Sequence, residues 1–378
     1  MHCDYYDAGR CRSCTLMGVP YAAQLADKQA GVAAALAQVA PGLTRLDPFA
    51  SSESGFRNKA KLVVGGLPGA VTLGILDGER RGVDLRRCGL YEPALRSVLP
   101  ALASVVDGLA IEPYDVPSRR GELKYLLLTA SPDGDLMLRL VLRSDRHVEQ
   151  LRAAVPHLTS AVHGVRVVSV NLHPEHKAVL EGDTELVLTS ESDLPMRVAG
   201  LTLHLRPRSF FQTNTVVAAG LYEQSREWIS AASPASVWDL YCGVGGFALA
   251  AATAATPPAH VLGVEVTQEA VDSARTSAAD LTLGSGMEFL AADATLLTDG
   301  RRPAPDLVVV NPPRRGIGPL ADWLEQASVS HVVYSSCNVD SLARDLASMP
   351  SLRPREARLF DMFPQTGHHE VMVRLERR

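Results

Sequence analysis

The sequence predicts an α/β protein in two parts: an α+β region over residues 1–200 and a doubly wound, mainly parallel sheet over residues 201–378. Three observations support this division. Strands and helices alternate regularly after residue 236, and short β-like runs broken by Gly and Pro dominate residues 56–200. The last two expected strands are joined by a Pro-Gly loop without a helix, so at least one of them is antiparallel. A length of 378 residues suits two domains.

The first part begins with an Ala-rich segment, 17–40, which is expected to be a helix because Leu25, Val32 and Leu36 recur at helical spacing. Pro41-Gly42 would end it. This helix could pack against the C-terminal domain. The region that follows predicts a mixed sheet with a helix or two, such as Val148–Ala154. Its expected strands are Lys61–Val64, Val71–Leu76, Tyr125–Leu128, Leu136–Leu142, Val165–Asn171, Ala178–Leu180, Glu185–Leu188 and Leu201–Leu205.

The second part predicts a regular succession of elements. The expected strands are Val237–Leu240, His260–Val266, Met287–Leu290, Asp306–Val310, His331–Tyr334, Arg355–Phe360 and Glu370–Leu375. The expected helices are Phe247–Thr256, Gln268–Leu281, Leu320–Gln326 and Val339–Ala347. Each of the first five strands ends close to a side chain that could bind a ligand or take part in catalysis. In strand order these are Asp239 and Tyr241, then Glu265, Asp293, Asn311 and Cys337. Ligands of such sheets bind beyond the carboxyl ends of the strands, so these residues are expected to share one cleft.

Composition excludes some classes of protein. Apolar residues make up 46% and charged residues 21%, which is typical of a globular chain and rules out general disorder. The net charge is −5, so the surface as a whole is not that of a nucleic-acid-binding protein. Residues 51–100 nevertheless carry eight basic and five acidic residues, which leaves room for a local basic patch.

Neither an export signal nor a membrane span is expected. No basic segment followed by an apolar one begins the chain, and the longest apolar run, Phe247–Thr256, is short. Six cysteines are too few for a secreted disulfide scaffold of this size. The expected compartment is the reducing cytosol, where clustered cysteines indicate a metal site or catalysis.

A glycine loop, Asp239-Leu240-Tyr241-Cys242-Gly243-Val244-Gly245-Gly246, connects the first strand of the second part to its helix. Glycines let the backbone approach a ligand, and Glu265 at the end of the next strand can accept hydrogen bonds from ribose hydroxyls. A dinucleotide and S-adenosylmethionine both fit, and a loop that binds no ligand remains an alternative. The antiparallel final strand and Asn311-Pro312-Pro313 favour the methyl donor.

Cys337 and Glu370 would suit methylation of uracil at C5, a carbon that is a poor nucleophile until a thiolate adds to C6. The subsequent loss of the C5 proton needs a base. Cys337 is a candidate for the thiolate and Glu370, which begins the last strand, for the base. A buried structural cysteine and an exposed strand-edge glutamate are the alternatives, and His368 and His369 are expected to be polar scaffolding.

Four more cysteines lie in the first quarter of the chain: Cys3, Cys11, Cys14 and Cys88. Four thiolates suit zinc or an iron–sulfur cluster, and unligated thiols are the third alternative. Only one CxxC pair is present, whereas zinc ribbons usually have two, so the spacing favours a cluster.

Ordered segments along nearly the whole chain resemble the RNA 5-methyluridine methyltransferase family, and in particular bacterial 23S rRNA (uracil-5-)-methyltransferases of the RlmC (RumB) type. The shared segments are the N-terminal cysteines, Gly55–Lys61, Arg120–Tyr125, Arg208–Asn214, Asp239–Gly246, Asn311–Gly318, Ser335–Asn338 and Phe360–Pro364 with His368 and Glu370. Tyr241 stands where a Phe is often found, and Asn311 replaces an Asp of other branches. The N-terminal β-barrel of other branches is not expected here, because the cysteines begin at residue 3, and this favours the RlmC branch.

The resemblance implies a Rossmann-like class I methyltransferase domain with an antiparallel final strand, preceded by an α+β RNA-binding domain that carries an iron–sulfur site. It implies a [4Fe–4S] cluster on Cys3, Cys11, Cys14 and Cys88, which would have a structural or RNA-positioning role. It implies S-adenosylmethionine contacts from Gln212, Tyr241, Glu265 and Asn311, with Asp293 near the adenine. It makes Cys337 the nucleophile and Glu370 the base. The implied substrate is the 747-type uridine of 23S rRNA, and a monomer is expected.

The target base would have to be flipped out of its stack to reach Cys337. Phosphate contacts are expected from a basic set in the first part of the chain: Arg57, Lys59, Lys61, Arg119, Arg120 and Lys124. The alternatives are 5-methyluridine formation at another rRNA or tRNA site, an amino-group methyltransferase, an inactive iron–sulfur protein that binds RNA or senses redox state, and, least of all, a nicotinamide oxidoreductase. An amino-group methyltransferase would want an aromatic residue after the prolines, where this chain has Arg314.

Overall fold

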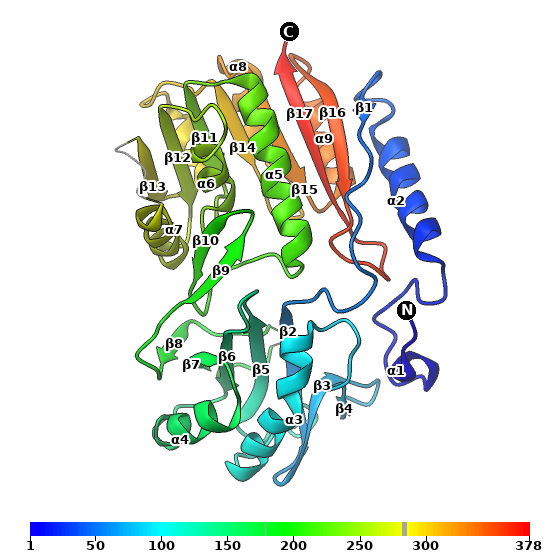
Figure 1. Ribbon diagram of the computed structural model, residues 1–378, viewed down its shortest axis with the longest axis vertical. Helices are drawn as coiled ribbons and strands as arrows, with labels where there is room; N and C mark the ends of the chain where they lie inside the picture. The colour runs from blue at the N-terminus through cyan, green and yellow to red at the C-terminus, as the bar shows by residue number, and fades with distance from the viewer. Residues whose placement is uncertain (178, 282–285) are drawn as a thin grey trace. The chain divides into compact units, whose positions relative to one another are not determined.

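The computed structural model describes residues 1–177, 179–281 and 286–378 (Figure 1). The described chain forms two compact units. Unit 1 comprises Met1–Met17, Glu53–Met196 and Arg206–Arg208, and unit 2 comprises Gly18–Ser52, Arg197–Leu205 and Ser209–Arg378. Residues 18–52 thus belong to the same unit as the C-terminal half of the chain. Among the described residues, none of the helices combines the length and the apolar composition needed to cross a bilayer.

Unit 1 is built on a seven-stranded mixed sheet in the order β4-β3-β2-β5-β6-β7-β8. The strands are β2 (Lys59–Leu67), β3 (Ala70–Leu76), β4 (Gly82–Asp84), β5 (Leu123–Ala130), β6 (Leu136–Leu142), β7 (Val165–Leu172) and β8 (Thr184–Val187). Only the β6–β7 pair is parallel, since the other pairs are antiparallel. Helices α3 (Pro93–Gly108) and α4 (Val148–Ala161) contribute with the sheet to one apolar core. A single turn of helix, α1 (Asp4–Asp7), lies near the N-terminus.

The pattern of side chains explains the central strands of unit 1. In β2, Ala60, Leu62 and Val64 are buried and alternate with Lys59 and Lys61, as expected when successive side chains point to opposite faces. Strand β6 is apolar except for Arg139 and is buried at every position, which is typical of a strand covered on both faces.

Unit 2 is built on an eight-stranded sheet in the order β1-β16-β17-β15-β14-β11-β12-β13. Every neighbouring pair of strands in this sheet is parallel except the two that involve β17, which confirms the predicted antiparallel final strand. The strands are β1 (Thr44–Arg45), β11 (Ser236–Leu240), β12 (His260–Glu265), β13 (Met287–Ala291), β14 (Leu307–Val310), β15 (His331–Ser336), β16 (Leu352–Phe360) and β17 (Glu370–Arg377). Strands β9 (Leu194–Val198) and β10 (Leu201–Leu205) form a separate two-stranded sheet.

Helices cover this sheet. They are α2 (Tyr21–Leu36), α5 (Thr215–Ala232), α6 (Gly246–Ala252), α7 (Gln268–Asp280), α8 (Leu320–Gln326) and α9 (Val339–Ala347), with a 3-10 helix, η1, at Ala294–Asp299. One core joins α2, α8 and α9 to alternate residues of the strands, such as Trp238, Leu240 and Val310. The intervening strand residues Val237 and Val309 are also buried, and Figure 1 shows α5 and α6 in front of the strands.

Several expected elements differ from the observed ones. Helix α2 is shorter than the predicted segment 17–40 because Pro20 immediately precedes it and the chain turns after Leu36. Helix α6 ends at Ala252 rather than Thr256, and α4 continues through Pro156 to Ala161. Helices α3 and α5 were not predicted as elements. The expected strand 178–180 is wrong at 179 and 180, which lie in no strand, and residue 178 lies outside the described residues.

Candidate functional site

Five predicted site residues lie at the carboxyl ends of five neighbouring parallel strands. Cys337 follows β15, Asn311 follows β14, Tyr241 follows β11, Glu265 ends β12, and Asp293 comes shortly after β13. These strands adjoin in the order β15-β14-β11-β12-β13. The parallel register therefore brings the five residues to the same edge of the sheet, which is where α/β sheets bind ligands.

The glycine loop between β11 and α6 is held in a tight conformation. Tyr241 has a φ of 65° and Gly245 a φ of 86°, both in the left-handed region. A side chain at Gly245 would also place its Cβ 3.0 Å from that of Ala274, so glycine is required there on two grounds. The carboxylate of Glu265 accepts hydrogen bonds from the N–H of Gly243 at 3.2 Å and of Thr267 at 3.1 Å. Glu265 is thus fixed against the loop.

Asp239, the first residue of the glycine loop, is fully buried and stabilises the loop through a hydrogen bond to α6. Its Oδ2 accepts a hydrogen bond of 2.8 Å from the N–H of Ala248 in α6. Burial raises the pKa of this carboxyl to about 8, opposed by the Ala248 N–H and reinforced by the charge of Glu265. Asp239 is therefore a structural part of the loop.

Gln212 lies in the same unit but outside the row of strand ends, in the segment before α5. Its side chain is buried. Two residues later, Asn214 caps α5 by accepting a hydrogen bond of 3.2 Å from the N–H of Val217. The cap fixes the end of the Arg208–Asn214 motif.

Cys337 and Glu370 are brought together by strand register. Strands β15 and β17 are antiparallel, and Ser336 pairs with Val371. Cys337 follows Ser336 and Glu370 precedes Val371, so the two residues flank the last pair of this ladder, and the charge of Glu370 acts on the Cys337 thiol. Neither residue is near the other in the sequence, and only the antiparallel last strand makes them neighbours.

The environment of this pair is desolvated and contains one cation. Burial raises the pKa of the Cys337 thiol, the Glu370 carboxylate raises it further, and the guanidinium of Arg314 lowers it. Burial raises the pKa of Glu370 to about 8 against the opposing charge of Arg314. Glu370 Oε2 is buried and has no hydrogen-bond partner among the described residues. The thiol of Cys337, the buried carboxyl of Glu370 and the guanidinium of Arg314 are thus close enough to influence one another's ionisation.

Arg314 lies in the turn that follows β14, within the Asn311–Gly318 motif. Contacts with residues outside the motif hold this turn in place. The N–H of Ile317 donates to Asp345 Oδ2 at 2.9 Å, and the hydroxyl of Tyr334 donates to the same oxygen at 2.6 Å. A Cβ on Gly316 would lie 2.3 Å from that oxygen. The sequence places Arg314 after the two prolines, but its electrostatic effect on Cys337 and Glu370 was not predicted.

The four N-terminal cysteines line one pocket of unit 1. Cys3, Cys11, Cys14 and Cys88 share it with Arg57 and aromatic residues, and all four are unpaired thiols. Burial, reinforced by the other three sulfurs, raises the pKa of Cys14 to about 11. Nowhere in the described chain do three or more His, Cys, Asp or Glu side chains converge closely enough to bind a single metal ion.

The basic residues proposed to contact phosphates differ in accessibility. Lys61, Arg119 and Arg120 are exposed. The prediction is wrong for Lys124, which is buried because its Nζ donates to the carbonyl of Glu175 at 2.6 Å and lies 4.8 Å from the centre of the Tyr114 ring.

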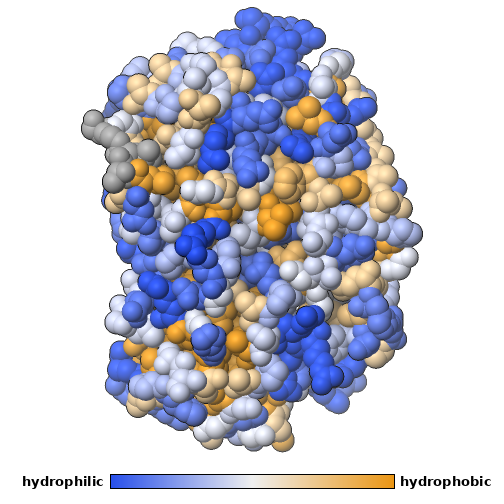
Figure 2. Space-filling view, in the orientation of Figure 1, coloured by the Kyte–Doolittle hydropathy of each residue, from blue (hydrophilic) through white to orange (hydrophobic). Residues whose placement is uncertain are grey.

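Three exposed apolar side chains flank predicted ligand-contacting residues of unit 2. Val266, 73% exposed, follows Glu265 directly, Leu296 comes three residues after Asp293, and Phe210 precedes Gln212 by two. Single exposed apolar residues are common, and on the face drawn in Figure 2 hydrophobic and hydrophilic residues are interspersed. Their positions next to the site make these three candidates for covering a bound ligand.

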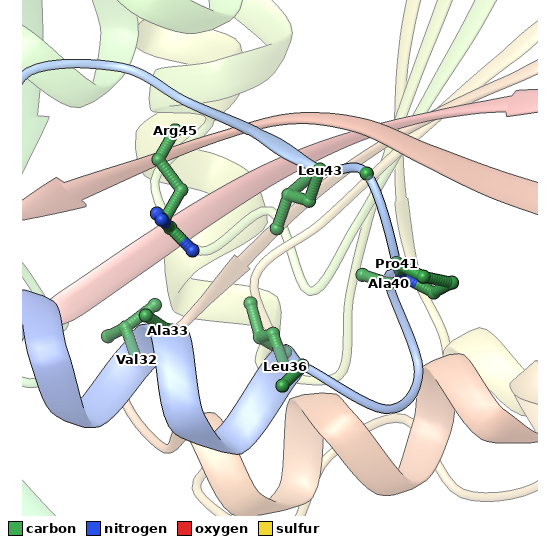
Figure 3. Close-up of a pocket in the computed structure, with 9 residues that line it drawn as sticks. Val32, Ala33, Leu36, Ala40, Pro41, Leu43 and Arg45 are labelled. Atoms are coloured by element: carbon green, nitrogen blue, oxygen red, sulfur yellow. The ribbon is translucent and has the colours of Figure 1, made fainter.

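A pocket beside the end of α2 contains none of the predicted site residues (Figure 3). It is lined mainly by apolar side chains, among them Val32, Leu36 and Leu43, with Arg45 from β1.

Comparisons with known proteins are consistent with this geometry. Residues 301–378 match the family model of tRNA (uracil-5-)-methyltransferases, and residues 227–330 match the methyltransferase small domain. The structure of Pyrococcus abyssi tRNA (uracil-54, C5)-methyltransferase in complex with S-adenosyl-L-homocysteine aligns with a TM-score of 0.79 and 23% identity, over 96% of this chain and 85% of that one. The fold is that of a class I S-adenosylmethionine-dependent methyltransferase.

Sequence relatives are closer. The chain is 47% identical to the 23S rRNA (uracil(747)-C(5))-methyltransferase RlmC of Halothiobacillus neapolitanus, with 100% of both chains covered. It is 45% identical to the protein of that name from Edwardsiella ictaluri, over 100% of this chain and 99% of that one. The chain therefore belongs to the RNA 5-methyluridine methyltransferase family, among the 23S rRNA (uracil(747)-C(5))-methyltransferases.

Proposed function

We propose that this protein transfers the methyl group of S-adenosylmethionine to C5 of uridine 747 in 23S rRNA. The names of its full-length relatives support the substrate. The observation that supports the chemistry is the position of Cys337 and Glu370, each one residue beyond the last β15–β17 pair, Ser336–Val371, with the electrostatic influence of Glu370 on the Cys337 thiol.

The reaction needs a nucleophile and a base on the same uracil. The thiolate of Cys337 adds to C6, and the electron pair of the C5–C6 double bond makes C5 nucleophilic. C5 attacks the methyl carbon of the sulfonium, and S-adenosylhomocysteine leaves. Glu370 then takes the C5 proton, the double bond re-forms, and the thiolate leaves C6. Each bond that forms is balanced by one that breaks, and Cys337 is regenerated.

The surroundings of Glu370 favour its role as the base. A base is most effective when its pKa is close to the operating pH, and burial raises that of Glu370 to about 8. The free Oε2 is the atom that would accept the proton. Arg314 favours the charged forms of both groups, so it supports the thiolate before attack and the carboxylate before proton removal.

Four residues of unit 2 are proposed to bind S-adenosylmethionine: Gln212, Tyr241, Glu265 and Asn311. Each oxygen of Glu265 accepts one backbone hydrogen bond and has a further lone pair for a ribose hydroxyl. Asp293 would lie near the adenine, with Val266 and Leu296 supplying apolar cover.

Cys3, Cys11, Cys14 and Cys88 are proposed to hold a [4Fe–4S] cluster. The four thiols line a single pocket and form no disulfide, and burial raises the pKa of Cys14 and of Cys88, which disfavours unligated thiolates at these two positions. The cluster would tie the N-terminal segment to the region of Cys88 and supply no electron to the methyl transfer.

Phosphates of the rRNA are proposed to contact Arg57, Lys61, Arg119 and Arg120. These side chains are exposed or partly exposed in unit 1, and Arg57 and Lys61 also line the cysteine pocket. We expect the protein to act as a monomer.

A 23S rRNA fragment transcribed with 5-fluorouridine tests the proposal. Fluorine at C5 cannot leave as a proton does, so a covalent complex that contains a methylated base should accumulate on Cys337, identified by mass spectrometry after digestion. Cys337→Ala should form no complex and should not turn over on unsubstituted RNA. Normal turnover by Cys337→Ala would refute the mechanism, and methylation of a different uridine would refute the assigned target.

A further inference from the structure

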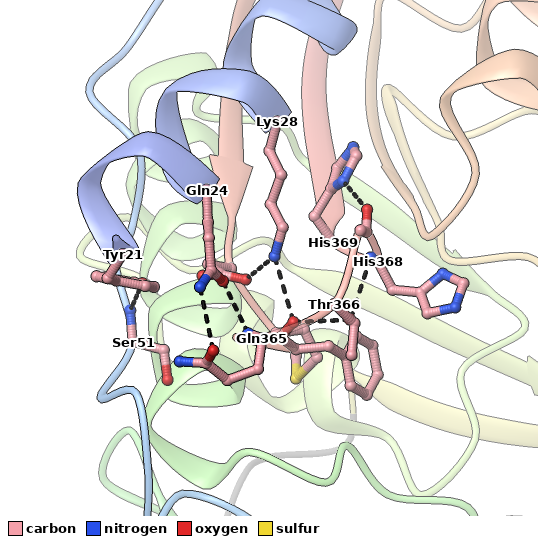
Figure 4. A network of polar contacts seen from close by, with 12 residues as sticks. Tyr21, Gln24, Lys28, Ser51, Gln365, Thr366, His368 and His369 are labelled. Carbon is pink, nitrogen blue, oxygen red and sulfur yellow. Dashed lines mark hydrogen bonds and ion pairs between the residues drawn. The ribbon is translucent and has the colours of Figure 1, made fainter. Parts of the chain in front are cut away.

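Helix α2 directs two buried polar side chains, Gln24 and Lys28, at the loop 361–369 that leads into Glu370 (Figure 4). They lie on the same helical stripe as Val32 and Leu36, which belong to the apolar core. A buried amide or ammonium group costs free energy unless it is hydrogen-bonded. The partners of Gln24 and Lys28 therefore indicate what these residues do.

Lys28 binds the start of the loop. Its Nζ lies 2.6 Å from Asp361 Oδ1 and donates to the carbonyl of Phe363 at 3.2 Å. The Lys28 and Asp361 side chains are 3% and 0% exposed, so water cannot replace either partner. One ammonium group thus fixes two residues of the loop.

Gln24 binds the middle of the loop. Its Nε2 donates to Gln365 Oε1 at 3.1 Å, and its Oε1 accepts from the Gln365 backbone N–H at 2.9 Å. Gln365 has a φ of 67°, a left-handed conformation that residues other than glycine rarely adopt. The paired hydrogen bonds hold the loop in that conformation.

A second branch connects α2 to the segment before α5. The hydroxyl of Tyr21 accepts from the N–H of Ser51 at 2.8 Å, and Ser51 Oγ accepts from Asn214 Nδ2 at 2.8 Å. Asn214 Nδ2 also lies 3.5 Å from the carbonyl of Met362. Helix α2 thus contacts, directly or through Ser51, both the loop and the motif that contains Gln212.

The loop closes directly on Glu370. Phe360 and Glu370 form the last pair of the β16–β17 hairpin, so residues 361–369 begin and end at that pair. The end of a ladder frays most easily, and here it carries the carboxyl that faces Cys337. Anchoring the loop at Asp361, Phe363 and Gln365 holds the end of the ladder closed.

We propose that Lys28 and Gln24 are positioning residues for Glu370, which hold its carboxyl where it can take the C5 proton. This inference rests on the proposed function, in which Glu370 is the base. Lys28 and Gln24 act through Asp361 and Gln365 rather than on the substrate. Their loss should therefore slow proton removal and the release of Cys337, while attack on C6 and methyl transfer proceed.

The test compares these two stages in variants of the full-length protein. Lys28→Met combined with Asp361→Asn removes both charges, so no unpaired charge stays buried. Gln24→Ala is a second variant that changes no charge, and Asp27→Asn removes an exposed charge from the same helix as a control. The rate of covalent complex formation on 5-fluorouridine RNA reports attack and methyl transfer. Turnover on unsubstituted RNA also requires proton removal.

We expect turnover of the two test variants to fall by up to about 100-fold and complex formation on 5-fluorouridine RNA to change by less than about threefold, since a misplacement of about 1 Å can cost that much. Covalent complexes with unsubstituted RNA should accumulate on denaturing gels. Asp27→Asn should behave as the parent protein does.

Two results would overturn the inference: turnover that is unchanged in both test variants, or equal losses of turnover and complex formation, as a general structural defect would produce. If the charge-pair variant does not fold, Gln24→Ala is judged by the same criteria. Glu370→Gln serves as the reference. Should it fail to accumulate covalent complexes on unsubstituted RNA, the assignment of the base fails; should it accumulate them while the test variants do not, only the positioning role fails.

Discussion

Replacing Glu370 by Gln should inactivate the protein, and the stability of unit 2 relative to the parent protein should rise with pH. The folded protein holds the Glu370 proton until a pH of about 8, whereas the unfolded chain releases it near the ordinary value of 4.5. Between these values the folded state binds more protons, so the contribution of Glu370 to stability falls as pH rises. The amide of the Glu370→Gln variant cannot ionise, so the variant lacks this loss.

The size of the gain follows from the difference in pKa. Each pH unit above 4.5 costs the parent protein about 1.4 kcal/mol, so the full penalty at pH 7 is about 3 kcal/mol. The buried amide introduced by Glu370→Gln must also find partners, which costs about 1–3 kcal/mol. That second cost is independent of pH. The quantity to measure is therefore the rise in the stability difference between the variant and the parent protein from pH 5 to pH 8.

Urea unfolding followed by tryptophan fluorescence would measure it. The three tryptophans, Trp228, Trp238 and Trp323, all lie in unit 2, so their emission reports on the unit that contains Glu370. The variant should gain stability relative to the parent protein steadily over this pH range, and should still form the covalent complex with 5-fluorouridine RNA. A stability difference that stays constant from pH 5 to pH 8 would show that Glu370 does not titrate there and would refute the reasoning.

Four further predictions concern other parts of the molecule. Glu265→Gln should weaken S-adenosylmethionine binding measured by calorimetry by roughly 10-fold or more, since hydrogen bonds to a charged acceptor contribute about 1.5–3 kcal/mol; unchanged affinity would remove Glu265 from the site. Cys88→Ser should lose protein-bound iron and its visible absorbance, and full iron content would contradict the cluster assignment. Tyr334→Phe should lower the free energy of unfolding by about 1.5–3 kcal/mol, because the buried Asp345 loses a donor, and a urea midpoint equal to that of the parent protein would contradict this. Lys61→Gln should reduce the slope of log binding constant against log salt by about 0.7–0.9 if the side chain contacts one phosphate, and an unchanged slope would argue against that contact.

The residues at the strand ends were the part of the candidate site that the sequence predicted best. Strands β11, β12 and β14 are short, mainly apolar runs that end at or just before Tyr241, Glu265 and Asn311, so their edges could be placed to within a residue or two. Once the sheet is parallel, Tyr241, Glu265 and Asn311 must share an edge, whatever the details of packing. The helices α3 and α5 were not predicted.

Contacts between residues far apart in the sequence were harder to predict. The position of Cys337 next to Glu370 depends on the antiparallel register of β15 and β17, which a single sequence does not specify beyond the direction of the last strand. The electrostatic role of Arg314 depends on a turn held by Asp345 from α9. The error at Lys124 has the same origin, since its charge indicated exposure and its partner, the carbonyl of Glu175, is 51 residues away.

The spacing of the buried residues of α2 in the sequence does indicate that they share one face of the helix. Gln24, Lys28, Val32 and Leu36 follow one another at intervals of four, so they share one face of a helix. Two apolar residues in that row indicate that the face is buried, and a lysine and a glutamine on it then require partners elsewhere in the chain. The sequence does not identify these partners, because Gln365 is separated from Gln24 by 341 residues.

Segment 18–52 contacts residues 352–365 in unit 2, and this long sequence separation has a consequence for the synthesis of the chain. Strand β1 pairs with β16, and α2 is hydrogen-bonded to the loop that precedes β17, so segment 18–52 cannot make these contacts until residues 352–365 have been synthesised. Contacts of such sequence separation make folding slow. A nascent chain that still lacks residues 361–378 has neither Glu370 nor the partners of Lys28 and Gln24. Under the proposed mechanism such a chain carries the nucleophile Cys337 without the base, so it is not yet able to complete the methylation.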